Sequence, residues 1–158
     1  GFVLGFNSCR PKSEGTVSIT SSRPGEAPSI RPNYLDHEDD RDEALAMARL
    51  IERLMATPAL TGILADEPLT PLDKMDDDAV LADFRQRGGT VFHLCGTCRM
   101  GPDAASSVVD SRLRVHGVEG LRICDASAFP NITSANTNAP TMMLAHRAAG
   151  MILQDGQR

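Results

Sequence analysis

The segment 131–152, NITSANTNAPTMMLAHRAAGMI, places a polar, turn-rich stretch directly before an almost wholly apolar helix. Asn136, Thr137 and Asn138 are residue types that cap helix N-termini, and Pro140 suits a first turn, where its missing N–H costs nothing. Because this helix has little polar surface, we expect its N-terminus to be buried. The unpaired N–H groups of such an end create a fixed positive potential. We therefore expect this end to receive an anion or to stabilise a negative charge that develops during a reaction.

The composition is that of a globular domain of 158 residues, with 41% hydrophobic and 23% charged residues. A net charge of −5 and the lack of any Lys/Arg cluster exclude a nucleic-acid-binding surface. No apolar run reaches the roughly 18 residues that a membrane span requires. Four cysteines at irregular spacing are too few for a disulfide framework, so we expect reduced thiols in the cytoplasm and leave membrane association open.

Two helices are expected in the first ninety residues. The first covers 40–55 behind the acidic stretch 36–42, and the second opens at the acidic run 76–78 and ends at Gly88 and Gly89. Consecutive carboxylates point in different directions, so we interpret 76–78 as helix caps rather than as metal ligands. The apolar residues expected on the inner faces are Met47, Leu50, Ile51, Leu54, Val80, Leu81 and Phe84.

Short strands are expected at 1–6, 15–19, 108–110, 113–115 and 121–124, whereas the Pro- and Gly-containing segments 21–30 and 57–71 are predicted to be loops. The fold class is therefore mixed, α/β or α+β. From residue 90 onward the chain becomes compact and Gly-rich, which predicts a boundary between one part at 1–90 and another at 91–158.

His93, Cys95 and Cys98 form an H-x-C-x-x-C cluster that is open to several interpretations. A zinc module would need a fourth ligand, such as Cys9, Cys124 or His116, and the sequence has no second ligand pair to supply it. A thiol redox site has the right C-x-x-C spacing, but it lacks the strand-to-helix context that lowers a thiol pKa. His93 itself precedes a Gly-rich turn, where it could act as a general base or simply be a partly buried structural histidine.

Two asparagines and one aspartate are also open to more than one interpretation. Asn136 and Asn138 could be site residues or only helix caps, and Asp125 at a strand end could meet a ligand or only close a turn.

Taken together, these motifs resemble the C-terminal part of glucose–methanol–choline (GMC) oxidoreductases, and among them most of all the bacterial choline and alcohol dehydrogenase branch. The motifs run in the family's order over nearly the whole chain. They are CRPKSEG at 9–15, PNYL at 32–35, HLCGTCRMG at 93–101, VVD at 108–110, LRVHGVEGLR at 113–122, DAS at 125–127 and NTNAPT at 136–141.

The resemblance implies roles for individual residues. His93 matches the family's catalytic histidine, which acts as acid and base, and Asn136 matches its partner on the substrate oxygen. Asp125 and Ala126 match the turn that passes the flavin, and Asn138 with Ala139 matches the segment that meets the isoalloxazine ring. The last helix of the family directs its N-terminus at the N1–C2=O edge of the flavin. The implied reaction is oxidation of an alcohol to an aldehyde or ketone, with hydride transfer to N5 of FAD.

The resemblance also implies a GMC-type two-domain fold. Residues 1–90 would belong to a substrate domain with an antiparallel sheet, and residues 91–158 would complete the FAD-binding domain. No G-x-G-x-x-G motif occurs in the chain, so it is not expected to bind FAD fully by itself. We expect the C-terminal piece of an enzyme whose N-terminal portion carries the Rossmann FAD-binding unit. The other partners would be a small-molecule alcohol and an electron acceptor, oxygen or quinone.

The sequence differs from the family pattern at two places, and two other functions stay open. Cys95 replaces a small aliphatic residue of the family, and His146 with Arg147 replaces an acidic residue followed by Lys. One alternative is a non-enzymatic thiol or zinc module built on His93, Cys95 and Cys98. The other is a diverged GMC flavoprotein with a lyase or binding role and no net oxidation.

Overall fold

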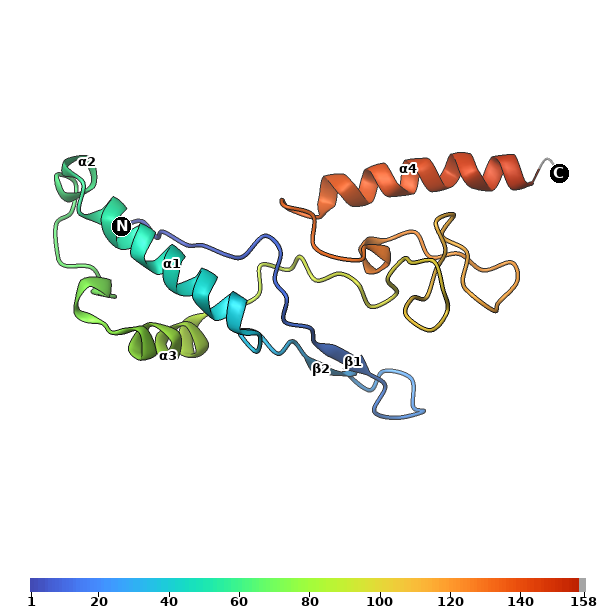
Figure 1. Cartoon of the computed structure of the whole chain (residues 1–158), viewed down its shortest axis with the longest axis horizontal. Coiled ribbons are helices and arrows are strands. Elements are labelled where there is room, and N and C mark those ends of the chain that lie inside the picture. The colour runs from blue at the N-terminus through green and yellow to red at the C-terminus, as the bar shows by residue number, and fades with distance from the viewer. Residues whose placement is uncertain (157–158) are drawn as a thin grey trace. The chain divides into compact units, whose positions relative to one another are not determined.

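The computed structural model describes residues 1–156, which form two compact units (Figure 1). The first unit contains Gly1–Gly15 and Pro32–Gly89, and the second contains Thr16–Arg31 and the chain from Thr90 onward. Within the described residues, helices and a small antiparallel sheet make up the regular structure, so the expected mixed class is confirmed. The assignment of 1–90 and 91–158 to two functional domains stays a prediction.

The first unit consists of helix α1 (Glu38–Met55) packed against helix α3 (Asp77–Arg87), with the short helices α2 (Pro58–Thr61) and η1 (Leu72–Lys74) between them in sequence (Figure 1). Both predicted helices are confirmed. Helix α1 begins earlier than expected because the His37 side chain caps it by accepting from the Asp39 N–H. Asp76 caps α3 by accepting from the Ala79 N–H, as expected for the acidic run. The segment 57–71 is not wholly irregular, since α2 forms within it.

The buried face of α1 differs from the predicted one. Its buried residues are Asp40, Ala44 and Ala48, whereas Leu50 and Leu54 are 47% and 44% exposed. Positions four apart share one helix face, and here that face consists of small residues. The inner residues of α3 are predicted correctly, with Val80 and Leu81 buried and Phe84 packed against the same cluster. This cluster contains Leu35, Ala44 and Leu81, with Phe6, Leu45 and Phe84 around it.

The predicted strand at 1–6 is wrong. A strand needs a neighbouring strand for its backbone hydrogen bonds, and this segment pairs with none in the described part of the chain. Its apolar residues instead end in Phe6, whose ring centroid lies 5.6 Å from that of Phe84.

Asp40, in the first turn of α1, fixes the segment that precedes the hairpin. Its carboxylate accepts from the backbone N–H of Lys12 at 2.8 Å and of Ser13 at 2.7 Å, and also from the Ser13 hydroxyl. Burial of Asp40, which is 4% exposed, opposes its ionisation, but these hydrogen bonds outweigh burial and hold the pKa of Asp40 below its usual value. The Lys-Ser pair of the CRPKSEG motif therefore has a structural role in this unit.

Replacing Asp40 with alanine is expected to destabilise the protein by about 1–3 kcal/mol in total, because the partly buried donors of Lys12 and Ser13 lose their partner. Because the pKa of Asp40 is lowered by folding, its contribution is complete above the ordinary carboxyl value and is lost as the pH falls through the folded-state value. Thermal unfolding at several pH values should show the difference between wild type and Asp40→Ala shrinking in acid. The exposed Asp42→Ala change is a matched control. A difference that stays constant down to the acid transition would contradict this role.

The strands of the second unit are shorter than predicted. Strand β1 (Thr16–Ser18) pairs antiparallel with β2 (Ser29–Arg31), with Val17 opposite Ile30. The strand expected at 15–19 is thus present, but part of β2 lies in the predicted loop 21–30. The expected strands at 108–110, 113–115 and 121–124 are wrong, because they form only single bridges: Met100 with Val109, Val109 with Val115, and Arg114 with Arg122.

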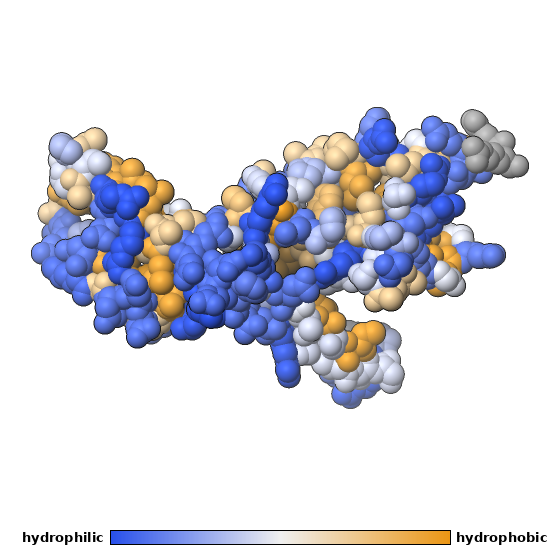
Figure 2. All heavy atoms as spheres, in the orientation of Figure 1, coloured by the Kyte–Doolittle hydropathy of each residue, from blue (hydrophilic) through white to orange (hydrophobic). Residues whose placement is uncertain are grey.

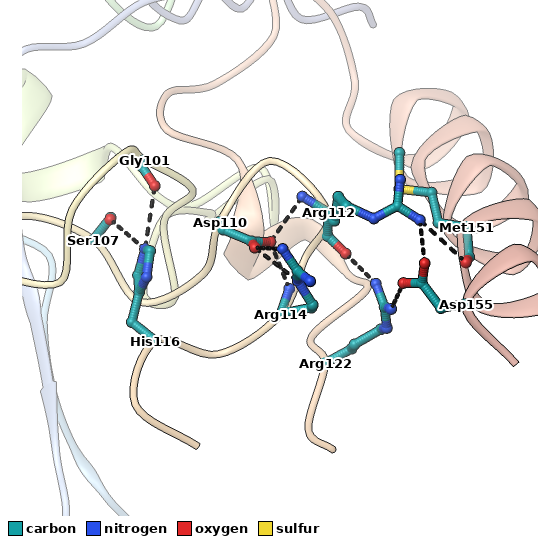
Figure 3. Close-up of polar contacts among 9 residues, drawn as sticks. All are labelled: Gly101, Ser107, Asp110, Arg112, Arg114, His116, Arg122, Met151 and Asp155. Atoms are coloured by element: carbon teal, nitrogen blue, oxygen red, sulfur yellow. Dashed lines mark hydrogen bonds and ion pairs between the residues drawn. The ribbon is translucent and has the colours of Figure 1, made fainter. Parts of the chain in front are cut away.

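Asp110 explains why these strands are interrupted. Its carboxylate accepts from the backbone N–H of Arg112 at 2.8 Å and of Arg114 at 3.0 Å, and Leu113 between them has a φ of 65° (Figure 3). A positive φ is uncommon in a non-glycine residue and is incompatible with extended backbone, so Leu113 interrupts the strand. The turn places Leu113, 1% exposed, in the core of this unit beside Val109, Ala128 and Ala148.

Ala128 belongs to the short helix η2 (Ala126–Ala128), and Ala148 to helix α4 (Asn138–Asp155). The C-terminal end of α4 is held by two arginines (Figure 3). Arg112 donates to Met151 O at 3.3 Å and to the Asp155 carboxylate at 2.8 Å, and Arg122 pairs with the same carboxylate. The hydrogen bond from Arg122, with that from Arg112, holds the pKa of Asp155 below its usual value. Asp155 would otherwise be unfavourable at a helix C-terminus, and the arginines offset this.

Helix α4 is not the buried helix that its sequence predicts. Leu144 and Ala148 face the core of the unit, but Met142, Met143 and Leu153 are 65%, 58% and 68% exposed. Figure 2 shows orange and pale orange atoms on the surface that α4 forms. The core of the second unit contacts only part of this helix, so its remaining apolar side chains stay exposed within residues 1–156. Among these residues, no helix combines the length and apolarity needed to cross a membrane.

Candidate active site

The segment that carries His93 is fixed to η2 by backbone hydrogen bonds. Cys98 N–H donates to Ser127 O and Met100 N–H donates to Ala128 O, each at 2.9 Å. Gly96 has a φ of 87°, and a Cβ at this position would lie 3.3 Å from Phe129 O. The turn therefore requires the conformation and small size of glycine. These contacts bring two distant stretches of sequence together and set the position of His93.

The ring of His93 contacts one residue at the start of α4, Thr137. Its Nδ1 lies 3.1 Å from Thr137 Oγ1 and 3.5 Å from the backbone nitrogen of Thr137. Thr137 is only 7% exposed, and His93 is half-buried. Within residues 1–156, the other ring nitrogen, Nε2, has no partner. A ring that is anchored at Nδ1 and open at Nε2 can accept a proton from, or return one to, a molecule bound beside it.

The N-terminus of α4 retains unpaired donors. Of the three residues that could cap it, Thr137 occupies the N-cap position, but its side chain makes no capping hydrogen bond. Pro140 lies in the first turn, as expected. The first turn contains no acidic residue, and Asn138 and Ala139 are exposed. The N–H groups at this end therefore present positive potential to whatever lies against them.

Asn136 precedes the cap and is exposed, and among the described residues it makes no hydrogen bond with His93. It is adjacent in sequence to the residue that does. The structure thus brings His93 to the 136–139 segment, but through Thr137, for which the sequence indicates only a possible capping role.

Asp125 and Ala126 form the start of η2. The Asp125 carboxylate accepts from the Ser127 N–H at 2.8 Å and from the Ser127 hydroxyl, so it caps this short helix. Asp125 is exposed and Ala126 is half-buried. Because the carboxylate is already engaged within the turn, the groups of Asp125 and Ala126 that could meet a ligand are those of the backbone.

The zinc alternative lacks a ligand set. In the described part of the chain, no three His, Cys, Asp or Glu side chains are grouped to hold a metal ion. His116, one possible fourth ligand, has its Nε2 at 3.2 Å from both Ser107 Oγ and Gly101 O (Figure 3). Cys124, another, packs against the core. Burial raises the pKa of the Cys95 thiol, and Arg99 opposes this only in part, so Cys95 is not an activated thiolate.

A family model described as GMC oxidoreductase matches residues 11–145. The chain is 42% identical over 152 residues to an oxygen-dependent choline dehydrogenase of Proteus mirabilis, covering 96% of this chain and 27% of that protein. It is 38% identical over 154 residues to an alcohol dehydrogenase [acceptor] of Pseudomonas putida, covering 98% of this chain and 28% of that protein. The chain thus spans little more than a quarter of the length of these curated relatives.

Solved structures agree with this match. An FAD-dependent oxidoreductase from Chaetomium thermophilum superposes with a TM-score of 0.83 at 26% identity, covering 90% of this chain and 25% of that one. Pyridoxine 4-oxidase from Mesorbium loti superposes with a TM-score of 0.73 at 31% identity, covering 89% and 27%. At the level of the family, the expected FAD cofactor is confirmed. With its fold, its ordered motifs and a matching model over most of its length, this chain belongs to the GMC oxidoreductase family.

Proposed function

We propose that this chain supplies the catalytic part of an FAD-dependent enzyme that oxidises the CH–OH group of a small-molecule alcohol to an aldehyde or ketone. The observation that carries the proposal is the position of His93, whose Nδ1 is anchored to Thr137 at the open N-terminus of α4 while its Nε2 has no partner in the described residues. The names of the relatives support the same reaction class, since they are a choline dehydrogenase and an alcohol dehydrogenase.

The residues at the start of α4 fit a flavin. The exposed Asn138 and Ala139 offer backbone N–H groups, and no acidic side chain in the first turn opposes an electron-rich ligand edge. We assign these residues, with the backbone of Asp125 and Ala126, to flavin contact. When bound, FAD supplies the hydride acceptor, and the helix N-terminus stabilises the negative charge of the reduced form.

His93 and Asn136 have different roles at the substrate oxygen. Nε2 of His93 takes the hydroxyl proton, which leaves the carbon–hydrogen bond free to release its hydride. The amide N–H of Asn136 donates to the same oxygen and orients it, and this amide cannot act as a base. Proton and hydride leave adjacent atoms, so holding the alcohol in one orientation supplies much of the rate.

The Rossmann unit that binds most of the FAD is not among these residues. The chain contains no G-x-G-x-x-G motif and covers 27–28% of its curated relatives. We propose that the N-terminal portion of the same enzyme supplies the Rossmann unit, that residues 1–90 belong to the substrate domain and that residues 91–158 complete the FAD domain. The final electron acceptor is oxygen or a quinone. We use "complete enzyme" below for this chain together with that N-terminal portion.

The purified complete enzyme is expected to contain FAD and to consume an electron acceptor in the presence of an alcohol. Flavin content, elemental analysis and acceptor consumption test this together. Stoichiometric zinc without flavin would support the thiol–metal alternative instead. Bound flavin without alcohol-dependent turnover of any acceptor would support a diverged lyase or binding protein. Either result would contradict the proposed oxidation.

A further inference from the structure

We propose that Thr137 is a positioning residue for the acid–base step: its hydroxyl holds His93 by Nδ1, so that Nε2 alone exchanges the proton with the substrate. This inference rests on the proposed role of His93. It concerns a residue that the sequence offers only as a helix cap.

The Thr137 hydroxyl is held rigidly. Thr137 O accepts from the Thr141 N–H at 3.0 Å and from the Thr141 hydroxyl at 2.7 Å, which fixes the backbone of Thr137 to the first turn of α4. A β-branched side chain has few accessible χ1 rotamers. Thr137 is also 7% exposed, so its side chain cannot swing into solvent. Oγ1 is therefore a fixed anchor at 3.1 Å from the ring.

Helix capping does not account for this hydroxyl. An N-cap side chain normally accepts from the N–H of the second or third helical residue. In α4 the third residue is Pro140, which has no N–H, and the structure shows no capping bond from Thr137. The sequence Thr-Asn-Ala-Pro thus removes one of the usual partners of the cap, and His93 is the only side chain that hydrogen-bonds the Thr137 hydroxyl among residues 1–156.

For Nε2 to take a proton, the neutral ring must carry its own proton on Nδ1, and the Thr137 hydroxyl oxygen accepts a hydrogen bond from this Nδ1–H in both states of the ring. When the substrate O–H bond breaks and an N–H bond forms at Nε2, the ring becomes an imidazolium with a proton on each nitrogen. The Nδ1–H still donates to Thr137 Oγ1, and no proton is transferred to threonine. The backbone N–H of Thr137 also points at Nδ1, but at 3.5 Å it is a weaker contact than the hydroxyl, and it cannot donate to Nδ1 while that nitrogen carries the proton.

No charged group substitutes for Thr137. The ionisable side chains on the neighbouring segments are Cys95 and Arg99, which follow His93, and Asp125 at the start of η2. The first turn of α4 has neither acidic nor basic residues. The Asp125 carboxylate is engaged by Ser127, and within residues 1–156 no carboxylate hydrogen-bonds the ring. The imidazolium that forms during the reaction therefore depends on a neutral hydroxyl at Nδ1.

The test compares Thr137→Val with Thr137→Ser in the complete enzyme. Valine keeps the shape of threonine and removes the hydroxyl, whereas serine keeps the hydroxyl. We expect Thr137→Val to lower kcat/KM roughly 10- to 100-fold, mainly through kcat, as for a lost hydrogen bond to a charged group. The acid limb of the pH profile should move to lower pH, because the protonated ring has lost a partner. Thr137→Ser should retain most of the activity and the original profile.

A merely structural role would change flavin content or thermal stability without moving the acid limb. If Thr137→Val disturbs folding, Thr137→Ala provides a second variant without the hydroxyl. Unchanged kinetics and pH profile in a folded hydroxyl-free variant would overturn the inference, and so would equal losses in the serine and valine variants. His93→Gln is measured in parallel. If His93→Gln is active, the proposed function itself is contradicted. If His93→Gln is inactive but Thr137→Val has wild-type kinetics, only the role of Thr137 is contradicted.

Discussion

Replacing His93 with alanine should lower kcat/KM of the complete enzyme by roughly 10²–10⁴-fold, the usual effect of losing an acid–base group. The reason is that Nε2 of His93 is the open nitrogen at the start of α4, whereas Nδ1 is already bound to Thr137. Without it, the alcohol must lose its proton to water. The loss should become smaller at high pH, where the alcohol ionises more readily.

His116 provides the matched control for this measurement. It is also half-buried and hydrogen-bonded, but its partners are Ser107 and Gly101 rather than a residue of α4. His116→Ala should therefore affect stability more than turnover. Retention of activity within about tenfold in His93→Ala would show that His93 is not the acid–base group.

Replacing Asn136 with alanine should lower kcat by roughly 10²–10³-fold, the range found when one donor to a developing oxyanion is removed. Asn136 is exposed next to the His93 anchor and makes no hydrogen bond to His93 in the described residues, so its amide is available to a bound alcohol. The loss should appear in kcat because the oxygen gains negative charge only as its proton leaves. FAD content should stay close to that of the wild type.

Asn138 is the internal control, since it has the same side chain two positions further along and lies in the first turn of α4. Its assigned contact is with the flavin, so Asn138→Ala, which removes the amide side chain at that contact, should reduce FAD retention more than it slows turnover of the flavin-containing fraction. Steady-state kinetics normalised to flavin content separate the two effects. Parallel losses of flavin and turnover in both variants would show that the two asparagines do not have separate roles.

The helices were predictable because their signals are local. The acidic stretch at the start of the first helix, the acidic cap of the second and Gly88 at the end of the second act within a few residues, and the structure has α1 and α3 at these places. The inner face of α1 was not predictable in the same way. Large apolar residues such as Leu50 dominate the periodicity, yet Ala44 and Ala48 are the ones buried, because α3 packs closely against small side chains.

The strands were predicted poorly because pairing is not a local property. The pieces at 108–110 and 113–115 have strand-like composition, but the Asp110 carboxylate binds the backbone between them and closes a turn. The buried character of α4 was overestimated for a related reason. Its apolar surface indicates that it can be covered, and composition alone does not specify by what.

In the candidate site, the sequence motifs predicted which segments matter but not which atoms meet. His93 was expected to work beside Asn136, whereas the hydrogen bond in the structure joins it to Thr137. A signal for Thr137 was present in the sequence. Pro140 three residues later removes a capping donor, and an N-cap threonine that loses a donor has a hydroxyl available for another partner.

We propose above all that these residues take a proton from an alcohol while its hydride reduces FAD. The most direct measurement is anaerobic mixing of the flavin-loaded complete enzyme with a panel of alcohols that includes choline, benzyl alcohol and primary aliphatic alcohols. At least one alcohol should bleach the visible band of the oxidised flavin in a single turnover, and His93→Ala should slow this bleaching strongly while dithionite still reduces both proteins. Bleaching by dithionite alone, with no response to any alcohol, or equally fast bleaching in His93→Ala, would contradict the account.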